Sequence, residues 1–475
     1  MAAAMQKVFS LAKFGGSSCA VRCLGTSSYQ YASTKTGTSS KKTLAKPGIP
    51  NIVLVDGVRT PFLQSGTSYK NLMPHDLART ALQGLLRKTG VSKEMVDYIV
   101  YGTVIQEVKT SNIAREAALG AGFSNRIPAH TVTQACISSN QAITTGMGMI
   151  ASGGCDSVVA GGVEFMSDVP IRHSRKMRKL MLSINKAKTL PARLQIISQM
   201  LSASALTPEL PAVAEFSTGE TMGHSADRLC AAFGITRQEQ DEFAVRSHTF
   251  AKAASDKGLL TDRLTYKVPG VAAPVEKDNG IRPSSMQDMA KLRAAFIKPH
   301  GTITAANASF LTDGASACLI MSEEKALQLG FKPKAYLRDY LYVAQDPKDQ
   351  LLLGPAYATP RIVEKAGLTL SDISVFEYHE AFAGQIMANL KALDSDFFCK
   401  SYMNRSAKYG APPMEKLNLW GGSLSLGHPF GATGVRLVTT AANRLEAEDG
   451  QYAVVAACAA GGLGHAMVVE RYPNK

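Results

Sequence analysis

The chain has 475 residues, of which 45% are hydrophobic and 19% charged, a composition typical of a globular protein with about two to four domains. The sequence has no run of eighteen apolar residues that would predict a transmembrane helix. Its eight cysteines are scattered without a CxxC pair, which argues against a disulfide framework or a zinc site and for a reducing compartment. The formal net charge is +14, and it is distributed unevenly along the chain.

The first 46 residues form a basic leader. The first acidic residue is Asp56, and seven lysines and arginines precede it among many serines, threonines, alanines and glycines. A basic, serine-rich, weakly amphipathic leader is typical of mitochondrial targeting, so we predict a transit peptide and basic linker over residues 1–46. A disordered basic tail is the alternative. Without these seven charges, the remainder of the chain carries +7.

Strands and helices alternate along the next part of the chain. Apolar runs predict strands at residues 51–55, 96–104 and 157–163, and apolar residues at helical spacing predict helices at 74–89, 111–121 and 140–152. The C-terminal third repeats this order, with strands predicted at 334–344, 373–378 and 452–457 and helices over 381–393, over 433–445 and from residue 360. This internal similarity suggests two duplicated α/β domains packed face to face, whose strand ends meet in one shared cleft.

The region between the two halves has a different composition. Residues 167–299 are rich in proline, lysine, arginine and methionine and lack the strand rhythm, so we interpret them as an inserted loop domain. Residues 301–317, GTITAANASFLTDGASA, return to the small-residue, strand-forming sequence of the first half. The predicted domains are an N-terminal one over 47–166 plus 300–325, the insertion over 167–299, and a C-terminal one over 326–475.

Cys136 lies at a predicted strand-to-helix junction in the segment HTVTQACISSNQA, residues 130–142. Unpaired backbone N–H groups at such a junction lower the pKa of a cysteine, and the thiolate is the nucleophilic form. An inert buried thiol is the alternative, and it is the commoner state of a single cysteine.

Three distant segments supply further reactive groups. His379 lies in YHEAF at a strand end, His428 lies in GGSLSLGHPFGATG before a helix, and Cys458 lies in CAAGGLG after a buried strand. Each is weak evidence by itself, since a histidine at a strand end is more often structural. Together with Cys136, they place a nucleophile, a base and an acid at the strand ends of one pseudo-symmetric cleft.

These segments, in this order, resemble the thiolase family. The resemblance covers nearly the whole chain after about residue 48 and rests on VDGVRTPF, CISSNQA, NASFLTDGASA, HEAF, GHPFGATG and CAAGGLG. It implies an α/β fold with two duplicated βαβαβαββ-type domains in a layered αβαβα arrangement, plus the inserted loop domain. HEAF replaces the NEAF of most thiolases, and with the leader and the basic insertion it implies a mitochondrial long-chain 3-ketoacyl-CoA thiolase of fatty acid β-oxidation.

The resemblance also implies a role for each reactive group. His428 removes the proton of Cys136, the thiolate attacks the 3-keto carbon of 3-ketoacyl-CoA, and Cys458 protonates the acetyl-CoA enolate that leaves. Cys458 then takes the proton of incoming CoA, which resolves the acyl-enzyme to a shortened acyl-CoA. The backbone N–H groups of Cys136 and Ala460 are expected to stabilise the tetrahedral oxyanion, and His428 and His379 the enolate.

Partners and ligands follow from the same resemblance. We expect a homodimer within a hetero-oligomer whose other subunit carries enoyl-CoA hydratase and 3-hydroxyacyl-CoA dehydrogenase, at the matrix face of the inner mitochondrial membrane. CoA is a co-substrate contacted by Ser309 and Gly461, and no other cofactor and no metal ion is expected. A biosynthetic, condensing thiolase is one alternative, and a non-catalytic membrane- or RNA-binding protein with this fold is another.

Some positions depart from the family pattern. His379 stands where most thiolases have an asparagine that orients a water, so it either donates directly or holds that water differently. Ala459 and Ala460 stand where the family commonly has a glycine, and Ser139 replaces a common glycine after the nucleophile.

Residues 171–208 concentrate the positive charge of the insertion. They include eight basic and no acidic residues, more than the +7 of the whole remainder. Their apolar residues form two stripes at helical spacing, Met177, Leu180, Met181 and Ile184, then Leu190, Leu194, Ile197 and Leu201. Pro191 fits the first turn of a second helix, so we predict two short helices with a break near residues 189–191.

A basic amphipathic segment of this kind suits an anionic membrane surface or a partner protein. An ordinary helix packed on the core and a cationic rim for CoA phosphates are the alternatives. Nucleic-acid binding is disfavoured, because the segment lacks aromatic residues.

Overall fold

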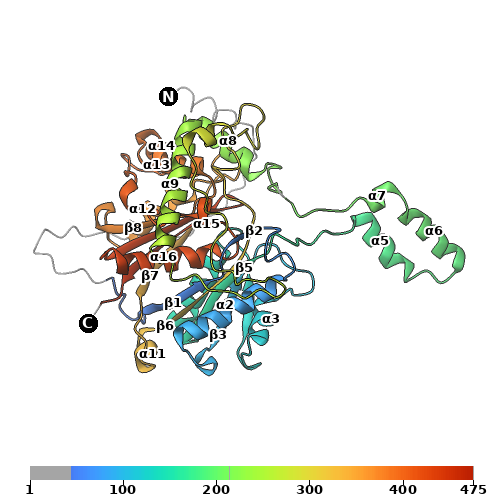
Figure 1. Ribbon diagram of the computed structural model, residues 1–475, viewed down its shortest axis with the longest axis horizontal. Helices are drawn as coiled ribbons and strands as arrows, with labels where there is room; N and C mark the ends of the chain where they lie inside the picture. The colour runs from blue at the N-terminus through green and yellow to red at the C-terminus, as the bar shows by residue number, and fades with distance from the viewer. Residues whose placement is uncertain (1–43, 213, 474–475) are drawn as a thin grey trace, which may run out of the picture.

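In the computed structural model, which describes residues 44–212 and 214–473, the strands join into one mixed sheet (Figure 1). The predicted transit peptide therefore lies almost wholly outside the described residues. The strand order is β4-β3-β5-β6-β1-β7-β10-β9-β8, and the short strand β2 pairs with β6. The strands are β1 (Ile52–Arg59), β2 (Leu63–Gln64), β3 (Tyr98–Gly102), β4 (Ala129–Val132), β5 (Ser157–Glu164), β6 (Thr312–Ser322), β7 (Ala335–Ala344), β8 (Ile373–Tyr378), β9 (Tyr452–Ala459) and β10 (Leu463–Arg471).

The sheet consists of two halves joined at β1 and β7. These two strands pair over only two residue pairs, Val53 with Tyr336 and Leu54 with Ala335, whereas β1 pairs along its length with β6. Each half has strands that pair in parallel, β3 with β4 and β5 in the first and β8 with β9 in the second. The predicted duplication is therefore visible as two half-sheets with a narrow junction.

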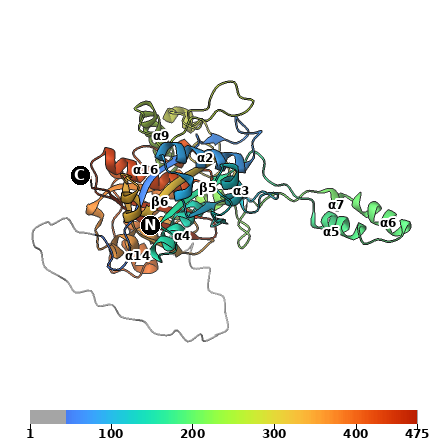
Figure 2. The same ribbon diagram turned by 90° about the horizontal axis from the view of Figure 1, so that it is seen from below.

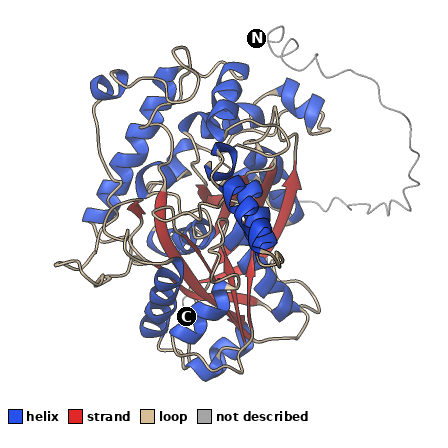
Figure 3. Ribbon diagram, turned by 90° about the vertical axis from the view of Figure 1, so that its right-hand side faces the viewer, coloured by secondary structure: helices blue, strands red, loops and turns tan. Residues whose placement is uncertain are grey.

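Helices cover both faces of these strands (Figure 3). The helices α4 (Ser138–Ala151) and α16 (Thr433–Ala447) share one buried apolar cluster with strands of both half-sheets, so they form the middle layer. On the outer face of the first half lie α2 (Pro74–Thr89) and α3 (Ile113–Gly120), and on that of the second lie α12 (Gly354–Lys365) and α13 (Ala383–Leu393). The layered αβαβα arrangement expected from the sequence is confirmed.

Beside the central helices, the two halves are also in direct backbone-to-backbone contact at two glycines. A Cβ added at Gly162, in β5, would overlap the carbonyl oxygen of Gly431, and a Cβ added at Gly431 would overlap that of Val163. Close by, the Ser139 hydroxyl of α4 accepts a hydrogen bond from the backbone N–H of Val435 in α16 at 3.2 Å. This contact explains the serine after the nucleophile, because it satisfies an N–H group in the first turn of α16.

Most predicted elements match observed ones, and two predictions are wrong. The α12 helix begins at Gly354 and contains Pro360, because Pro355 is the proline that occupies the first turn. Cys458 lies within β9 rather than after it, since the strand continues to Ala459. The remaining helices are α5 (Arg175–Ile184), α6 (Leu190–Met200), α7 (Ala203–Leu206), α8 (Met222–Ala232), α9 (Arg237–Asp256), α10 (Met286–Ala290), α11 (Glu323–Gln328), α14 (Asp396–Tyr402) and α15 (Ser423–Leu426).

The insertion has two parts with different surroundings. Helices α8 and α9 contribute to the apolar cluster of the second half-sheet, whereas α5, α6 and α7 stand away from the body on two extended segments (Figures 1 and 2). The two predicted short helices are confirmed, with Pro191 in the first turn of α6. Within the described residues, no helix is both long and apolar enough to cross a bilayer. The exact domain boundaries stay a prediction.

Candidate active site

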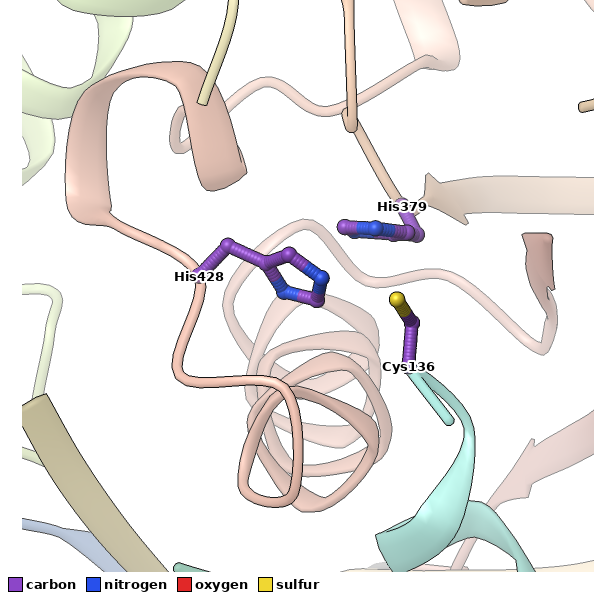
Figure 4. A group of neighbouring side chains, drawn as sticks. All are labelled: Cys136, His379 and His428. Atoms are coloured by element: carbon purple, nitrogen blue, oxygen red, sulfur yellow. The ribbon is translucent and has the colours of Figure 1, made fainter. Parts of the chain in front are cut away.

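Three side chains from different parts of the sequence meet at the strand ends (Figure 4). Cys136 lies two residues before α4, His379 directly follows β8, and His428 lies in the loop between α15 and α16. One ligating atom of each lies within 4.8 Å of the other two, and the imidazole centroids are 4.0 Å apart. A cysteine and two histidines are a donor set that Zn²⁺ accepts, and the same atoms suit a thiol nucleophile with a neighbouring base.

A tight turn places Cys136 at the head of α4. Ala135, the preceding residue, has φ of 46°, a left-handed conformation that costs energy for a residue with a Cβ. The Ser138 hydroxyl holds this turn, since it donates to the carbonyl oxygen of Ala135 at 2.7 Å and accepts from the N–H of Gln134 at 2.8 Å. The backbone therefore presents the thiol to the cleft in a fixed position.

The predicted lowering of the Cys136 pKa is wrong. Burial raises the pKa of Cys136 to about 12, and the backbone N–H of Ala460, which points at the sulfur, offsets only part of this rise. The carboxylate charge of Glu164 also acts in the raising direction. The resting thiol thus keeps its proton at neutral pH, and a nucleophilic reaction needs a base beside it.

His428 has the hydrogen bonding of such a base. Its Nδ1 lies 2.7 Å from the Thr433 hydroxyl, and that hydroxyl donates its proton to the carbonyl oxygen of Pro429 at 3.1 Å. With the hydroxyl proton on that carbonyl, the hydroxyl oxygen accepts from Nδ1–H, and this tautomer has a lone pair on Nε2. Nε2 has no hydrogen-bond partner among the described residues, and burial with the neighbouring His379 and Arg436 holds the pKa of His428 well below its usual value.

Cys458 and His379 complete the predicted reactive set. Cys458 is buried in β9, and burial raises its pKa. A thiolate on Cys136 would raise it further. His379 is fully buried, and its backbone N–H donates to the carbonyl oxygen of Ala456 in β9 at 2.9 Å. Burial and Arg436 lower the pKa of His379 to about 3, so its imidazole is neutral.

The two predicted CoA contacts lie at the edges of this set. The backbone N–H of Ser309 donates to the carbonyl oxygen of Ala381 at 3.0 Å, which places Ser309 beside the HEAF segment. Gly461 is exposed on the loop after β9, has φ of 86°, and donates its N–H to Glu215 at 3.1 Å. The contact with Glu215 connects the loop after Cys458 to the insertion. Their role in binding CoA stays a prediction.

Sequence reasoning missed the buried carboxylates around the site. Glu164, at the end of β5, accepts backbone N–H groups from Val104, Ile105 and Gly431 at 3.0–3.1 Å, and burial raises its pKa to about 7. Glu380, next to His379, accepts from the Ser247 hydroxyl, from the Asn418 amide and from a backbone N–H. A charged residue that directly ends an apolar run, as Glu164 does after VVAGGV, is the signal that could have identified it.

Comparison with known proteins gives the family. Models of the thiolase N-terminal and C-terminal domains match residues 52–324 and 331–471. The chain belongs to the thiolase family. Among solved structures, this thiolase resembles human mitochondrial 3-ketoacyl-CoA thiolase in complex with CoA, with a TM-score of 0.75, 29% identity, and coverage of 89% of this chain and 98% of that one.

Curated relatives are closer in sequence. The thiolase is 72% identical over 454 residues to the mitochondrial trifunctional enzyme subunit beta of Bos taurus, and 70% identical to that of Homo sapiens. Both matches cover 96% of this chain and 95% of the relative. It is also 63% identical over 442 residues, or 93% of this chain and 98% of the relative, to a probable 3-ketoacyl-CoA thiolase of Caenorhabditis elegans.

Proposed function

We propose that this thiolase cleaves 3-ketoacyl-CoA with CoA, giving acetyl-CoA and an acyl-CoA shortened by two carbons, as the thiolase subunit of a mitochondrial trifunctional enzyme. The observation that carries the proposal is the meeting of the Cys136 thiol with two neutral imidazoles within 4.8 Å. The names of the closely similar relatives support the substrate class. CoA is a substrate here, and the reaction needs no further cofactor.

In the first half of the reaction, the proton of Cys136 moves to Nε2 of His428 as the sulfur attacks the 3-keto carbon. The ketone oxygen becomes an oxyanion, which the backbone N–H groups of Cys136 and Ala460 stabilise. When this intermediate collapses, the carbon–carbon bond breaks, the acyl group stays on Cys136, and the electron pair leaves as the enolate of acetyl-CoA. His428, now protonated on Nε2, and His379 stabilise the enolate oxygen.

Cys458 serves the second half. Its thiol gives a proton to the enolate carbon, which releases acetyl-CoA, and the resulting thiolate takes the proton of incoming CoA. The CoA thiolate attacks the acyl group on Cys136 and restores the free thiol with the proton held by His428. The elevated pKa of Cys458 supports this role, because a strongly basic thiolate can accept the proton of CoA.

The direct test is mass spectrometry after brief exposure of the protein to a 3-ketoacyl-CoA without free CoA. The acyl group is expected on Cys136, and an adduct only on Cys458 would reverse the two roles. Turnover of a 3-ketoacyl-CoA with CoA, compared with condensation of acetyl-CoA alone, separates degradation from biosynthesis. Since the same atoms suit Zn²⁺, turnover after chelation and after zinc addition is a further control, and loss on chelation would indicate a metal centre.

The proposed assembly is a homodimer bound to a hydratase/dehydrogenase subunit in mitochondria. The relatives' name, subunit beta of a trifunctional enzyme, supports the second subunit. The strand β4 supports the homodimer, since it lies at one edge of the sheet, where a strand of a second copy could be added. Purification from mitochondria should yield both subunits, and an active particle with only this chain would contradict the hetero-oligomer.

We also propose that the α5–α7 hairpin binds an anionic membrane surface, which would place the enzyme at the inner membrane. Leu190 and Leu194 of α6 and Leu201, which directly follows this helix, have exposed fractions of 69%, 57% and 71%. In the predicted stripe of α5, Met177, Leu180 and Ile184 are partly covered, whereas Met181 is exposed. Of the basic residues, Arg178 pairs with Glu209, and most of the others are exposed.

Vesicle flotation tests this proposal. A variant with Arg175, Lys179, Lys186 and Lys188 changed to Gln should bind cardiolipin-containing vesicles far less tightly at low salt, since each basic residue near the surface contributes roughly 1 kcal/mol. High salt should weaken wild-type binding, because exposed charges are screened. The matched control changes four exposed lysines of the body, Lys257, Lys267, Lys277 and Lys332, to Gln. Equal binding to neutral vesicles, or equal loss in the control, would contradict the membrane surface and leave a partner protein as the occupant.

A further inference from the structure

His379 lies at the end of a chain of buried hydrogen bonds. Its Nδ1 is 3.1 Å from the Ser423 hydroxyl in α15, and the same hydroxyl is 3.0 Å from Nη2 of Arg436 in α16. All three side chains are at least 99% buried. The chain runs from the guanidinium through the hydroxyl to the imidazole, and the remaining nitrogen of that ring lies at the site (Figure 4).

The hydrogen-bond donors of Arg436 and Ser423 determine the tautomer of the His379 imidazole. A guanidinium has only donors, so the Ser423 oxygen accepts from Arg436. The hydroxyl has one proton of its own, and among the described residues the acceptor placed for it is Nδ1 of His379. Nδ1 therefore accepts, and the single ring proton of the neutral imidazole is on Nε2. Nε2 has no hydrogen-bond partner among the described residues.

We propose that Ser423 and Arg436 are positioning residues that hold His379 in the Nε2–H tautomer, so that it donates a hydrogen bond directly to the substrate oxygen. The neighbouring His428 is held in the opposite tautomer by Thr433, with a lone pair on Nε2. Two neighbouring imidazoles, tilted by 40° relative to each other, thus face the substrate as one donor and one base. This inference rests on the proposed thiolase function and assigns the donor that the enolate needs.

The surroundings of Arg436 support a role other than stability. Its Nε and Nη1 have no hydrogen-bond partner among the described residues, and Nη1 is 3.6 Å from the carboxylate of Glu377. The charges of Glu377 and Glu380 favour the guanidinium, and burial opposes it. A buried cation with unsatisfied donors is destabilising compared with an apolar side chain of similar size. Among the residues that the structure describes, its side chain donates one hydrogen bond, to Ser423.

The first test compares Ser423→Ala with Ser423→Thr. Without the hydroxyl, Nδ1 of His379 can carry the proton, which turns a lone pair toward the substrate oxygen, so we expect kcat to fall up to about 100-fold, as when an oxyanion donor is lost. The threonine variant retains the hydroxyl and should restore most of the activity. KM should change little, and alkylation of Cys136 by iodoacetamide should keep its rate, because His428 is untouched.

The decisive test repeats Ser423→Ala in a His379→Asn background. An asparagine side chain always has amide donors and has no tautomers, so there the loss of the hydroxyl should change kcat less than about twofold. An equal loss in both backgrounds, or full activity of Ser423→Ala alone, would overturn the proposal. A wild-type enzyme without thiolytic turnover would instead contradict the proposed function, so the two failures are distinguishable.

Discussion

The cleft and the α5–α7 hairpin use polar residues in opposite ways. In the cleft, His379 and His428 are buried and Cys136 is partly exposed, and burial moves each pKa away from its usual value. In the hairpin, most of the basic side chains are exposed, and leucines of α6 are exposed beside them. The comparison shows that the cleft depends on a few fixed contacts, whereas the hairpin depends on its summed charge and apolar surface.

The largest expected effect is the loss of the nucleophile. Cys136→Ala should lower kcat by on the order of 10⁴–10⁶, the range seen when the nucleophile of a covalent mechanism is removed. Because the cleft and the hairpin are separate, the variant should bind vesicles as the wild type does. The measurement is turnover of a 3-ketoacyl-CoA, with vesicle flotation as the control. Turnover within tenfold of the wild type would exclude an acyl-Cys136 intermediate.

The next effect concerns the base. His428→Ala should lower kcat by about 10²–10⁴ and slow alkylation of Cys136 by iodoacetamide near neutral pH, because the thiol then keeps its proton. Rates of alkylation and turnover for this variant provide the measurement. His465→Ala, which removes another fully buried histidine, is the control and should leave alkylation unchanged. Unchanged rates in His428→Ala would remove this residue from the mechanism.

The core and the hairpin should also differ in how much a leucine contributes to the free energy of unfolding. Leu437 of α16 is fully buried between the half-sheets, whereas Leu194 of α6 is 57% exposed. Leu437→Ala should lower the free energy of unfolding by about 2–5 kcal/mol, because it leaves a cavity in the middle layer. Leu194→Ala should change it by less than about 0.5 kcal/mol, since it removes little packing. Denaturant unfolding measures both, and a similar cost would show that the hairpin is part of the core.

The smallest effect concerns pH. Glu164 has a folded pKa of about 7, above the usual value for an unfolded chain, so between these two values the native state holds a proton that the unfolded state has lost. Its contribution therefore makes the protein less stable as pH rises from about 4.5 to 7, by roughly 1–3 kcal/mol. Glu164→Gln removes this titration. The unfolding free energies of the two proteins, compared at several pH values, should diverge, and parallel curves would contradict the prediction.

The amino-acid sequence predicts most strands and helices of the two halves, because their apolar spacing matches their burial, but it does not predict β10. It also identifies Cys136, His379, His428 and Cys458, through the segments that resemble thiolases. The sequence predicts the start of α12 at residue 360 instead of Gly354, because either Pro355 or Pro360 could occupy the first turn of the helix. Apolar spacing alone does not choose between the two prolines.

The sequence could not predict features that depend on exact three-dimensional packing. The pKa of Cys136 depends on how completely the fold encloses the thiol, and local motif chemistry suggested the wrong direction. The hydrogen bonds of Ser423 join residues 379, 423 and 436, and they form only when β8, α15 and α16 come together. The covering of the α5 stripe likewise depends on how α5 and α6 pack.

The contact between Gly162 and Gly431 has a consequence for which sequences this enzyme can tolerate. His428 lies three residues before Gly431, so the loop that carries the base rests directly on the end of β5, without side chains between them. A methyl group at either position would act as a wedge between the half-sheets and move the base relative to the nucleophile. Natural variants at these two glycines should therefore impair catalysis even where the protein still folds, whereas variants on the hairpin should chiefly alter where the enzyme resides.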